Sequence, residues 1–496
     1  MRINKVVLKY LASAGVLVLL AASLANLVIK DSTPFKPVKS SVKLDSLANF
    51  YKQKLNWRGC YGNFECAMFQ VPINYADVPT GKFDIAVMRH SADNAIGNLV
   101  VNPGGPGGSG VDYVYSYQDA FTEEVTNKFN IVGFDPRGVS RSAPIKCLSA
   151  AETDKYYSED VSPETPEGLA KLQAESADFA KSCSEKNKYL AFYSTANAAR
   201  DMDILRNLLG DEKLNYLGKS YGTYMGSLYA KLFPDRVGRF VLDGAVDPTL
   251  NSVAQSFQQA YGFDDAFKSF SVDCQTKSDC VLSGDGLAMV SSKLNELKSN
   301  PLTVGNRKLT ESLAIYGIAY GLYDPAQGWS SLRKALKDLY DGNGAALMAL
   351  ADSYTGRDSN GRYATNDAES MTVILCDDFP AANIDPATVK DTPTLFGKYV
   401  AYGDIDCNYL PHSEFVLIKE PIVLNSSVLV IGTANDPATP YQWAVKLNKI
   451  LVNSRLITLN SDGHTGYNRG DGCVNQAVEK YLISGVIPAE NLTCSA

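Results

Sequence analysis

Histidine is scarce in this chain, with three residues in 496, at positions 90, 412 and 464. The C-x-x-C spacing of redox and zinc sites does not occur. Neither does the zinc motif H-E-x-x-H, nor the complete phosphate-loop motif G-x-x-x-x-G-K-[ST]. We also find no internal repeat and no low-complexity tract. We therefore expect no metal and no cofactor, and few candidates for a histidine with a chemical role.

An excess of positive charge is also missing. The chain has 47 Lys and Arg against 54 Asp and Glu, which gives a formal net charge of −7. Lysine and arginine form no run beyond the first residues, whereas a nucleic-acid-binding protein normally presents a basic face. We therefore expect no nucleic-acid partner.

The N-terminal segment has the composition of an export signal. Arg2, Lys5 and Lys9 precede an apolar run over 10–29, and Ser23-Leu24-Ala25 offers the small residues that a signal peptidase needs. Residues 1–30 are predicted to be a signal peptide. The alternative is an uncleaved anchor, because twenty apolar residues can span a bilayer. In both cases the rest of the chain is exported, and it contacts a membrane only if the segment stays attached.

All ten cysteines lie downstream of this segment. An even count without C-x-x-C in an exported chain favours disulfides. Eight cysteines already allow 105 connectivities, so the pairing stays open. Chain order suggests the pairs 60–66, 147–183, 274–280, 376–407 and 473–494.

Short apolar runs separated by helical periodicity predict an α/β fold. Runs of four to eight apolar residues are typical of parallel strands buried on both faces. We expect about eight strands in one mostly parallel sheet. They fall at 68–72, 83–87, 98–101, 130–134, 214–217, 237–242, 427–432 and 455–459.

The pattern becomes helical between these two blocks of strands. Leu287–Leu297 and Leu309–Leu350 read as helices, broken at Asp-Pro and at Gly-Asn-Gly. We interpret 251–415 as a helical cap inserted into a core formed by 31–250 and 416–496. An independent second domain is the alternative, but the return to strands after residue 415 favours insertion.

The strongest chemical motif is Gly218-Lys219-Ser220-Tyr221-Gly222, which directly follows a predicted strand and precedes a predicted helix. A nucleophile on a sharp strand-to-helix turn needs flanking glycines, because side chains there would clash. The pattern alone is weak in a chain with 38 glycines. Its position between strand and helix makes Ser220 the candidate nucleophile.

A nucleophilic serine needs a general base, and the base needs a carboxylate that orients it. His464 lies in a loop just past the last predicted strand, whereas His90 and His412 fit surface or structural roles. Asp436 follows the penultimate strand. The chain order Ser220, Asp436, His464 is that of α/β-hydrolases.

The segment Asn102–Gly110 contains five glycines and follows another predicted strand. Oxyanion charge is stabilised by backbone N–H groups that can approach closely, so we assign the two donors to Gly105 and Tyr221. The same segment also matches G-x-G-x-x-G, with Asp135 after the next strand, as in a dinucleotide site. Pro106 inside that turn and the separate triad favour the oxyanion loop. Asp135 and Arg137 are expected to form a structural ion pair beside the site.

These motifs together resemble the exported tripeptidyl aminopeptidase family, relatives of the proline iminopeptidases. The resemblance extends over most of the chain after about residue 55 and is weakest in the cap. One departure is Asn102, where proline iminopeptidases have histidine. The matching residues are 102–110, 133–138, 218–222, 241–244, 436–440, Gly463, His464, Cys473, Tyr481, Leu482, Gly485, Pro488 and Cys494.

The resemblance implies release of di- or tripeptides from the N-terminus of peptide substrates. Such an enzyme must recognise a free ammonium group, and Glu369, Asp377 and Asp378 around Cys376 are the candidate carboxylates; the alternative is that they are solvated acids at a helix end. Two other functions remain open. A carboxylesterase would use the same triad, and a non-catalytic binding module of this fold would have lost triad members.

Overall fold

The computed structural model describes residues 35–36, 42–379, 395–412, 415–470 and 472–495. The predicted signal segment at 1–30 lies outside them. Within the described ranges, no helix has the length and apolar character needed to cross a membrane.

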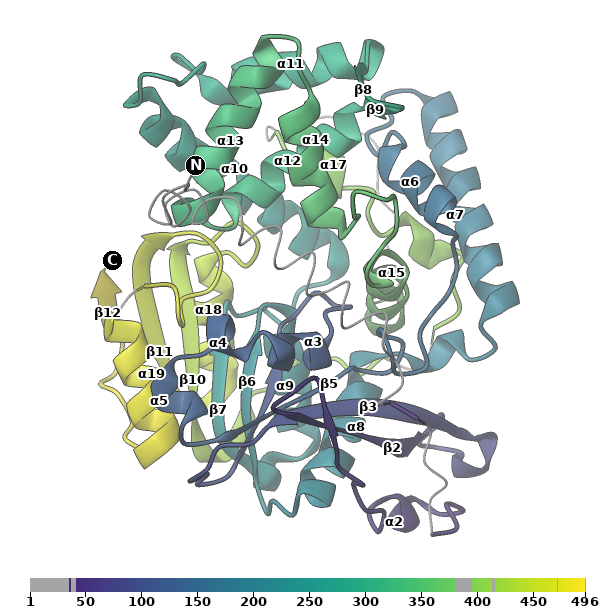
Figure 1. Cartoon of the computed structure of the whole chain (residues 1–496), viewed down its shortest axis with the longest axis vertical. Coiled ribbons are helices and arrows are strands. Elements are labelled where there is room, and N and C mark those ends of the chain that lie inside the picture. Colours follow the sequence, from purple (N-terminus) through teal and green to yellow (C-terminus); the bar gives the residue numbers. More distant parts are fainter. Residues whose placement is uncertain (1–34, 37–41, 380–394, 413–414, 471, 496) are drawn as a thin grey trace, which may run out of the picture.

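A ten-stranded sheet forms the centre of the molecule (Figure 1), in the order β1-β2-β3-β5-β4-β6-β7-β10-β11-β12. Strands β5 through β12 of this order are parallel, whereas β1, β2 and β3 pair antiparallel and β3 joins β5 antiparallel. The bounds are β1 Arg58–Cys60, β2 Phe64–Pro72, β3 Lys82–His90, β4 Asn98–Asn102, β5 Asn130–Phe134, β6 Leu214–Lys219, β7 Val237–Asp243, β10 Ile422–Asn435, β11 Leu451–Asp462 and β12 Leu492–Ser495.

All eight predicted strands are confirmed, and the structure adds β1 and β12 at the two edges. These strands have only three and four residues, too few for an apolar run to mark them. Each edge strand carries a disulfide instead. Cys60 in β1 bonds to Cys66 in β2, and Cys494 in β12 bonds to Cys473 in α19 (Gly472–Ser484).

Helices cover both faces of the sheet. Successive residues of β4 point to opposite faces of the sheet. Val100 packs into the hydrophobic core on one face, and Leu99 and Val101 pack into the core on the other. Burial on both sides explains why the strands read as continuous apolar runs. One face is covered by α8 (Thr195–Leu209), α9 (Tyr221–Leu232) and α18 (Tyr441–Ile450), and the other by α3 (Gly110–Tyr115), α5 (Glu123–Thr126) and α19.

The segment between β7 and β10 forms a helical layer over the sheet domain (Figure 1), which we call the cap. It has a core of its own, with Phe267, Ile318 and Leu336 at its centre. The predicted breaks are confirmed: Asp324-Pro325 separates α12 from α13, and 342–344 separates α13 from α14. Its elements are α10 Ser252–Gln275, α11 Gly286–Ser299, the hairpin β8 Leu302–Val304 and β9 Arg307–Leu309, α12 Glu311–Leu322, α13 Pro325–Tyr340, α14 Ala345–Thr355, α15 Asp367–Asp378, α17 Gly397–Val400 and η5 Ile405–Asn408.

Two helices that precede the predicted cap boundary at residue 251 also pack against the cap. They are α6 (Ala150–Ser158) and α7 (Pro166–Lys186), which lie beside it in Figure 1. Tyr157 of α6 packs on the cap core. Two separate stretches of the chain therefore build the layer that covers the sheet.

All ten cysteines are paired, in the order suggested by the chain. Cys147–Cys183 joins the loop after β5 to α7, and Cys376–Cys407 joins α15 to η5. Cys274–Cys280 closes a short loop after α10. Five disulfides are typical of a protein that folds in an oxidising compartment.

Candidate active site

Ser220 occupies the sharp turn between β6 and α9. Its backbone has φ +55° and ψ −126°, a strained conformation for a residue with a side chain. The flanking glycines leave the space that this turn needs. A Cβ on Gly218 would lie 2.5 Å from the carbonyl oxygen of Gly222, and one on Gly222 would lie 2.8 Å from Oδ1 of Asn102.

His464 and Asp436 meet at the carboxyl end of the neighbouring strands. Nδ1 of His464 lies 2.9 Å from both carboxylate oxygens of Asp436. Asp436 is 2% exposed, and its position after β10 brings it beside the loop that follows β11. This contact leaves Nε2 of the imidazole available to act as a base.

The carboxylate of Asp436 is held by four further donors. Oδ1 accepts the backbone N–H groups of Ala438 and Thr439 at 2.9 and 2.8 Å. Oδ2 accepts the Thr439 hydroxyl at 3.0 Å and the Thr465 N–H at 3.2 Å. These four hydrogen bonds fix the orientation of the carboxylate. Thr439 was not singled out from the sequence.

The cap contributes directly to the position of His464. Tyr323, which follows α12, accepts the backbone N–H of His464 at 2.9 Å through its carbonyl oxygen. Its ring meets the imidazole edge-on, with centroids 5.3 Å apart. Tyr323 was not predicted from the sequence, because nothing near it in the chain marks a residue that contacts a loop about 140 positions later.

The glycine-rich loop after β4 lies against the turn of Ser220. A Cβ on Gly104 would lie 2.9 Å from Cβ of Ser220 and 3.3 Å from the backbone nitrogen of Tyr221, so only glycine fits there. The buried side chain of Asn102 accepts the N–H of Gly104 at 2.9 Å. Gly105 and Tyr221, the predicted oxyanion donors, line the same cavity as Ser220.

A cavity of about 510 Å³ between the cap and the sheet domain contains Ser220 and His464. One face of α15 forms a wall, because Asp367, Met371 and Leu375 recur at every fourth position. Four tyrosines form much of the rest: Tyr157, Tyr320, Tyr323 and Tyr354. Aromatic and apolar side chains therefore line the cavity together with polar groups, among them Ser220, Gln259 and His464.

Two carboxylates line this cavity without an ion-pair partner among the described residues, Asp367 and Asp404. Oδ1 of Asp367 is buried and accepts no hydrogen bond within the described part of the chain. Burial raises the pKa of Asp367 to about 7, although the Thr365 hydroxyl opposes the rise. Burial also raises the pKa of Asp404. Both sites favour a cation as a partner.

The structure corrects the prediction for Glu369, Asp377 and Asp378. None of these carboxylates lines the cavity of Ser220. Asp377 accepts the N–H of Tyr193 at 2.7 Å, and Asp378 accepts the N–H of Thr195 at 2.7 Å. Buried carboxylates that bind backbone N–H groups at the start of α8 stabilise the helix end rather than a substrate.

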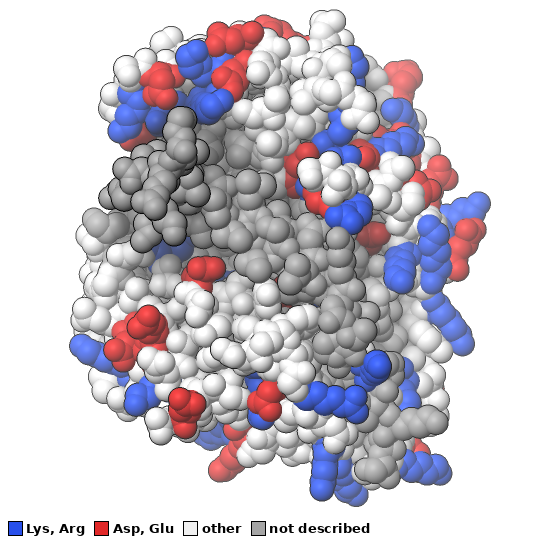
Figure 2. Space-filling model, in the orientation of Figure 1, with Lys and Arg blue, Asp and Glu red and all other residues white. Residues whose placement is uncertain are grey.

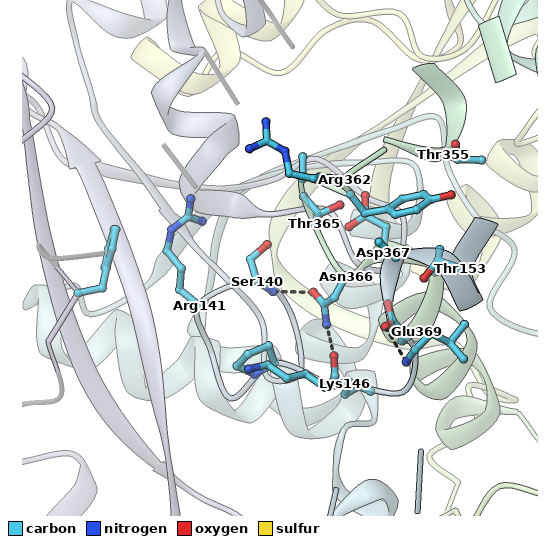
Figure 3. Close-up of a pocket in the computed structure, with 18 residues that line it drawn as sticks. Ser140, Arg141, Lys146, Thr153, Thr355, Arg362, Thr365, Asn366, Asp367 and Glu369 are labelled. Atoms are coloured by element: carbon cyan, nitrogen blue, oxygen red, sulfur yellow. Dashed lines mark hydrogen bonds between the residues drawn. The ribbon is translucent and has the colours of Figure 1, made fainter. Parts of the chain in front are cut away.

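Glu369 faces a second cavity, of about 680 Å³, shown in Figure 3. Its Oε1 accepts the N–H of Leu148 at 3.3 Å. In the same view Asn366 accepts the N–H of Ser140 and donates to the carbonyl of Ile145, which ties α15 to the loop after β5. Asp367 lies between the two cavities and lines both.

The expected ion pair between Asp135 and Arg137 is also corrected. Arg137 is fully buried and binds Asp201 of α8 through two nitrogens, at 2.6 and 2.7 Å. Asp135 pairs with Arg141 at 3.1 Å. Both residues are structural, as expected, but each partner lies where no local motif could mark it.

The other two histidines lie away from the cavity. The ring of His90 stacks on Tyr117, and that of His412 stacks on Phe415. Within the described ranges, no cluster of three or more histidine, cysteine or acidic side chains has a geometry that could hold a metal ion.

A family model for the alpha/beta hydrolase fold matches residues 97–468. The chain belongs to this family. The serine protease Hip1 of Mycobacterium tuberculosis is 36% identical over 461 residues, which cover 87% of this chain and 88% of the relative. Carboxylesterase B of the same species is 35% identical and covers 87% and 86%. The tripeptidyl aminopeptidase of Streptomyces lividans is 30% identical and covers 89% and 86%.

Membership of the α/β-hydrolase family agrees with the arrangement of the sheet, the turn of Ser220 and the cap. The resemblance to the tripeptidyl aminopeptidases is confirmed, and the protein is a serine hydrolase. The names of two relatives support a serine peptidase of this fold, and a third relative is named a carboxylesterase.

Proposed function

We propose that this α/β-hydrolase is an exported serine peptidase that removes di- or tripeptides from substrates with a free N-terminus. Ser220 is the nucleophile, His464 the general base and Asp436 the residue that orients the imidazole. The observation that carries the proposal is Oδ1 of Asp367, which is buried and has no hydrogen-bond partner among the described residues, in the cavity that also contains Ser220 and His464.

The reaction follows the two steps of acyl transfer to water. Ser220 Oγ attacks the scissile carbonyl carbon while Nε2 of His464 takes its proton. His464 then donates that proton to the leaving amine, and an acyl-enzyme remains on Ser220. A water molecule, deprotonated by the same imidazole, hydrolyses the ester and restores the serine. Asp436 keeps Nδ1 protonated through both steps.

Two backbone N–H groups are suited to stabilise the oxyanion. Tyr221 is the first residue of α9, where helix N–H groups have no partner within the helix. Gly105 belongs to the loop that presses against the turn of Ser220. Preorganised donors of this kind typically contribute a factor of about 10²–10³ each to kcat.

The free N-terminus of the substrate is assigned to Asp367. An α-ammonium group that pairs with this carboxylate satisfies an oxygen that otherwise has no partner among the described residues. Asp367 begins α15, and a Cβ on Gly107 of the glycine-rich loop would lie 3.4 Å from its Cα. The cation would therefore bind close to the oxyanion loop, which suits a short N-terminal fragment.

A pair of matched peptides tests this assignment. A short peptide anilide with a free N-terminus should be cleaved much faster than its N-acetyl derivative. Loss of one partner of a desolvated charge pair costs about 2–5 kcal/mol, so Asp367→Asn should lower kcat/KM for the free peptide tens-fold or more. The N-acetyl peptide should be unaffected by the substitution. Asp341→Asn, at an exposed acid of the cap, is the control.

Two results would contradict parts of this proposal. If Asp404→Asn abolishes the preference for the free peptide and Asp367→Asn does not, the ammonium site is at Asp404. If wild-type protein cleaves both peptides equally well, the aminopeptidase proposal fails and the serine hydrolase remains.

A carboxylesterase is the second candidate, because one relative carries that name and the aromatic wall of the cavity suits an uncharged acyl group. This activity predicts fast turnover of short acyl esters and indifference to N-acetylation of peptides. A non-catalytic binding module is disfavoured, because all three triad residues are present, His464 contacts Asp436, and Ser220 lines the same cavity as His464.

Export is part of the proposal. The five disulfides support an oxidising compartment, and the segment at 1–30 has the composition of a signal. N-terminal sequencing of the protein from its native source would locate any cleavage. A start at residue 1 in a soluble fraction would contradict it.

A further inference from the structure

Asp243, the last residue of β7, contacts two parts of the site at once. Its side chain is fully buried. Its carbonyl oxygen accepts the backbone N–H of Ser220 at 2.8 Å. Its carboxylate accepts the N–H of Gly466 at 2.8 Å and that of Tyr467 at 3.0 Å, one on each oxygen. One residue therefore joins the turn that carries Ser220 to the loop that carries His464.

The loop of His464 needs such anchors because its backbone is strained. Thr465 has φ +68°, in the left-handed region that residues with a side chain rarely adopt. Such a residue costs about 1–3 kcal/mol and persists only where the surroundings hold it. Asp436 binds the imidazole and the Thr465 N–H. Asp243 binds the next two N–H groups along the chain.

Lys219 completes the arrangement around Asp243. Its Nζ donates to the carbonyl of Tyr467 at 2.9 Å, so the residue before the nucleophile also holds the histidine loop. Burial raises the pKa of Asp243, and the Lys219 ammonium and the two backbone N–H groups oppose that rise. These groups stabilise an ionised carboxylate that can accept both hydrogen bonds.

We propose that Asp243 is a positioning residue that sets where the imidazole of His464 lies relative to Ser220. This role rests on the proposed triad but not on the choice between peptide and ester substrates. Misplacement of a catalytic group by about 1 Å can cost about 10²-fold in rate. Asp243 is not among the residues that line the cavity, so its loss should act on kcat and leave KM unchanged.

Asp243→Asn is the sharpest variant, because it keeps the size of the side chain and changes only its hydrogen bonding. An amide has one acceptor oxygen, so its NH2 group would face one of the two backbone N–H groups. We expect kcat and the rate of fluorophosphonate labelling of Ser220 to fall about 10²-fold, with KM within about twofold. Asp247→Asn is the matched control: Asp247 is a buried acid four positions later that accepts the N–H of Thr249, and its loss should leave both rates unchanged.

A spectroscopic measurement separates positioning from a general loss of structure. The chain has only three histidines, so the side-chain NMR signals of isotopically labelled histidine can be assigned by substitution. In folded Asp243→Asn the signals of His464 should shift, while those of His90 and His412 should not. A purely structural role would lower the melting temperature and leave the His464 signals and kcat per folded molecule unchanged.

A folded Asp243→Asn variant with wild-type kcat and labelling rate would overturn the proposal. If the variant does not fold, deuterium exchange on the wild type decides: the peptide that contains Gly466 and Tyr467 should exchange slowly, and exchange as fast as that of an exposed loop would overturn it. Failure of the proposed function has a different signature. If Ser220 is labelled but no peptide is cleaved, the peptidase proposal is contradicted. The role of Asp243 can still be tested by the labelling rate.

Discussion

At the scale of single residues, the site depends on side chains that hold backbone in place. Asn102 is the residue at which this chain departs from the proline iminopeptidases. Its Oδ1 accepts the N–H of Gly104, next to the proposed oxyanion donor Gly105. The amide therefore fixes the glycine-rich loop without being a donor itself.

Asn102→Ala should lower kcat about tenfold with little change in KM. The effect is smaller than the loss of an oxyanion donor, which lowers kcat about 10²–10³-fold, because the loop would move but keep its donor. Steady-state kinetics on an anilide substrate would measure this. Asn98→Ala, in the same strand but at its other end beside Asp211, should stay within about twofold. Equal losses in both variants would contradict a specific role for Asn102.

The raised pKa of Asp367 predicts a distinctive pH dependence. Below pH 7 the carboxyl group is protonated and cannot pair with an ammonium, because burial raises its pKa to about 7. The ratio of kcat/KM for a free peptide to that for its N-acetyl form should therefore rise between about pH 5.5 and 7.5. It should fall again above about pH 8, where the α-amino group loses its proton. Since both substrates use the same triad, the ratio cancels any effect of pH on the chemical steps that the two substrates share. A ratio that does not vary with pH would exclude Asp367 as the ammonium site.

The sequence was informative about residues whose role is marked by their neighbours in the chain. Ser220 has its flanking glycines, and Asp436 and His464 each follow a strand in the order known for the fold. The predicted ammonium-binding acids do not line the cavity of Ser220, because burial and hydrogen-bond partners, which the sequence does not show, decide which carboxylate faces the cavity. Asp378 accepts a hydrogen bond from the backbone N–H of Thr195 at the start of α8. Asp367, in contrast, has a carboxylate oxygen with no hydrogen-bond partner among the described residues.

At the scale of elements, α15 connects the cap to the cavity. One of its faces lines the cavity beside Ser220, and Cys376 at its end bonds to Cys407 in η5. This disulfide closes a loop with a sequence separation of 31. It holds a wall of the cavity to a segment that contributes Asp404.

Replacing Cys376 and Cys407 together by serine should destabilise the protein by about 3–4 kcal/mol on the loop-entropy argument. It should also raise KM for peptides, because the wall formed by α15 loses an anchor. Thermal denaturation and steady-state kinetics would measure the two effects. Removal of Cys274–Cys280, with a separation of 6, should cost about 2 kcal/mol and leave KM unchanged. The same KM in both double variants would argue against a role for α15 in binding.

The eight long strands and the helical cap could be predicted because each has a sustained apolar pattern. The edge strands β1 and β12 could not be predicted, because three or four residues are too few to show an apolar pattern. The packing of α6 and α7 against the cap was also missed. Only the three-dimensional arrangement shows which surface these two helices cover.

At the scale of the whole molecule, a cap covers the candidate serine hydrolase site, and the face drawn in Figure 2 carries charge of both signs. Figure 2 shows Lys and Arg interspersed with Asp and Glu on this face, without an extended area of one sign. We expect selectivity to arise inside the cavity, from its tyrosines and from Asp367 and Asp404, which have no ion-pair partner among the described residues.

The central claim is that Ser220 is the nucleophile of a peptidase. The most direct measurement is to label the protein with a fluorophosphonate, locate the label by peptide mass spectrometry, and follow cleavage of a free N-terminal peptide in the same sample. We predict that the label is on Ser220, that cleavage is lost in proportion to labelling, and that Ser220→Ala lowers kcat about 10⁶-fold. Ser353→Ala, which removes another hydroxyl in the cavity, should label and cleave as the wild type does. A label on a different residue, or peptide cleavage that survives full labelling of Ser220, would contradict the claim.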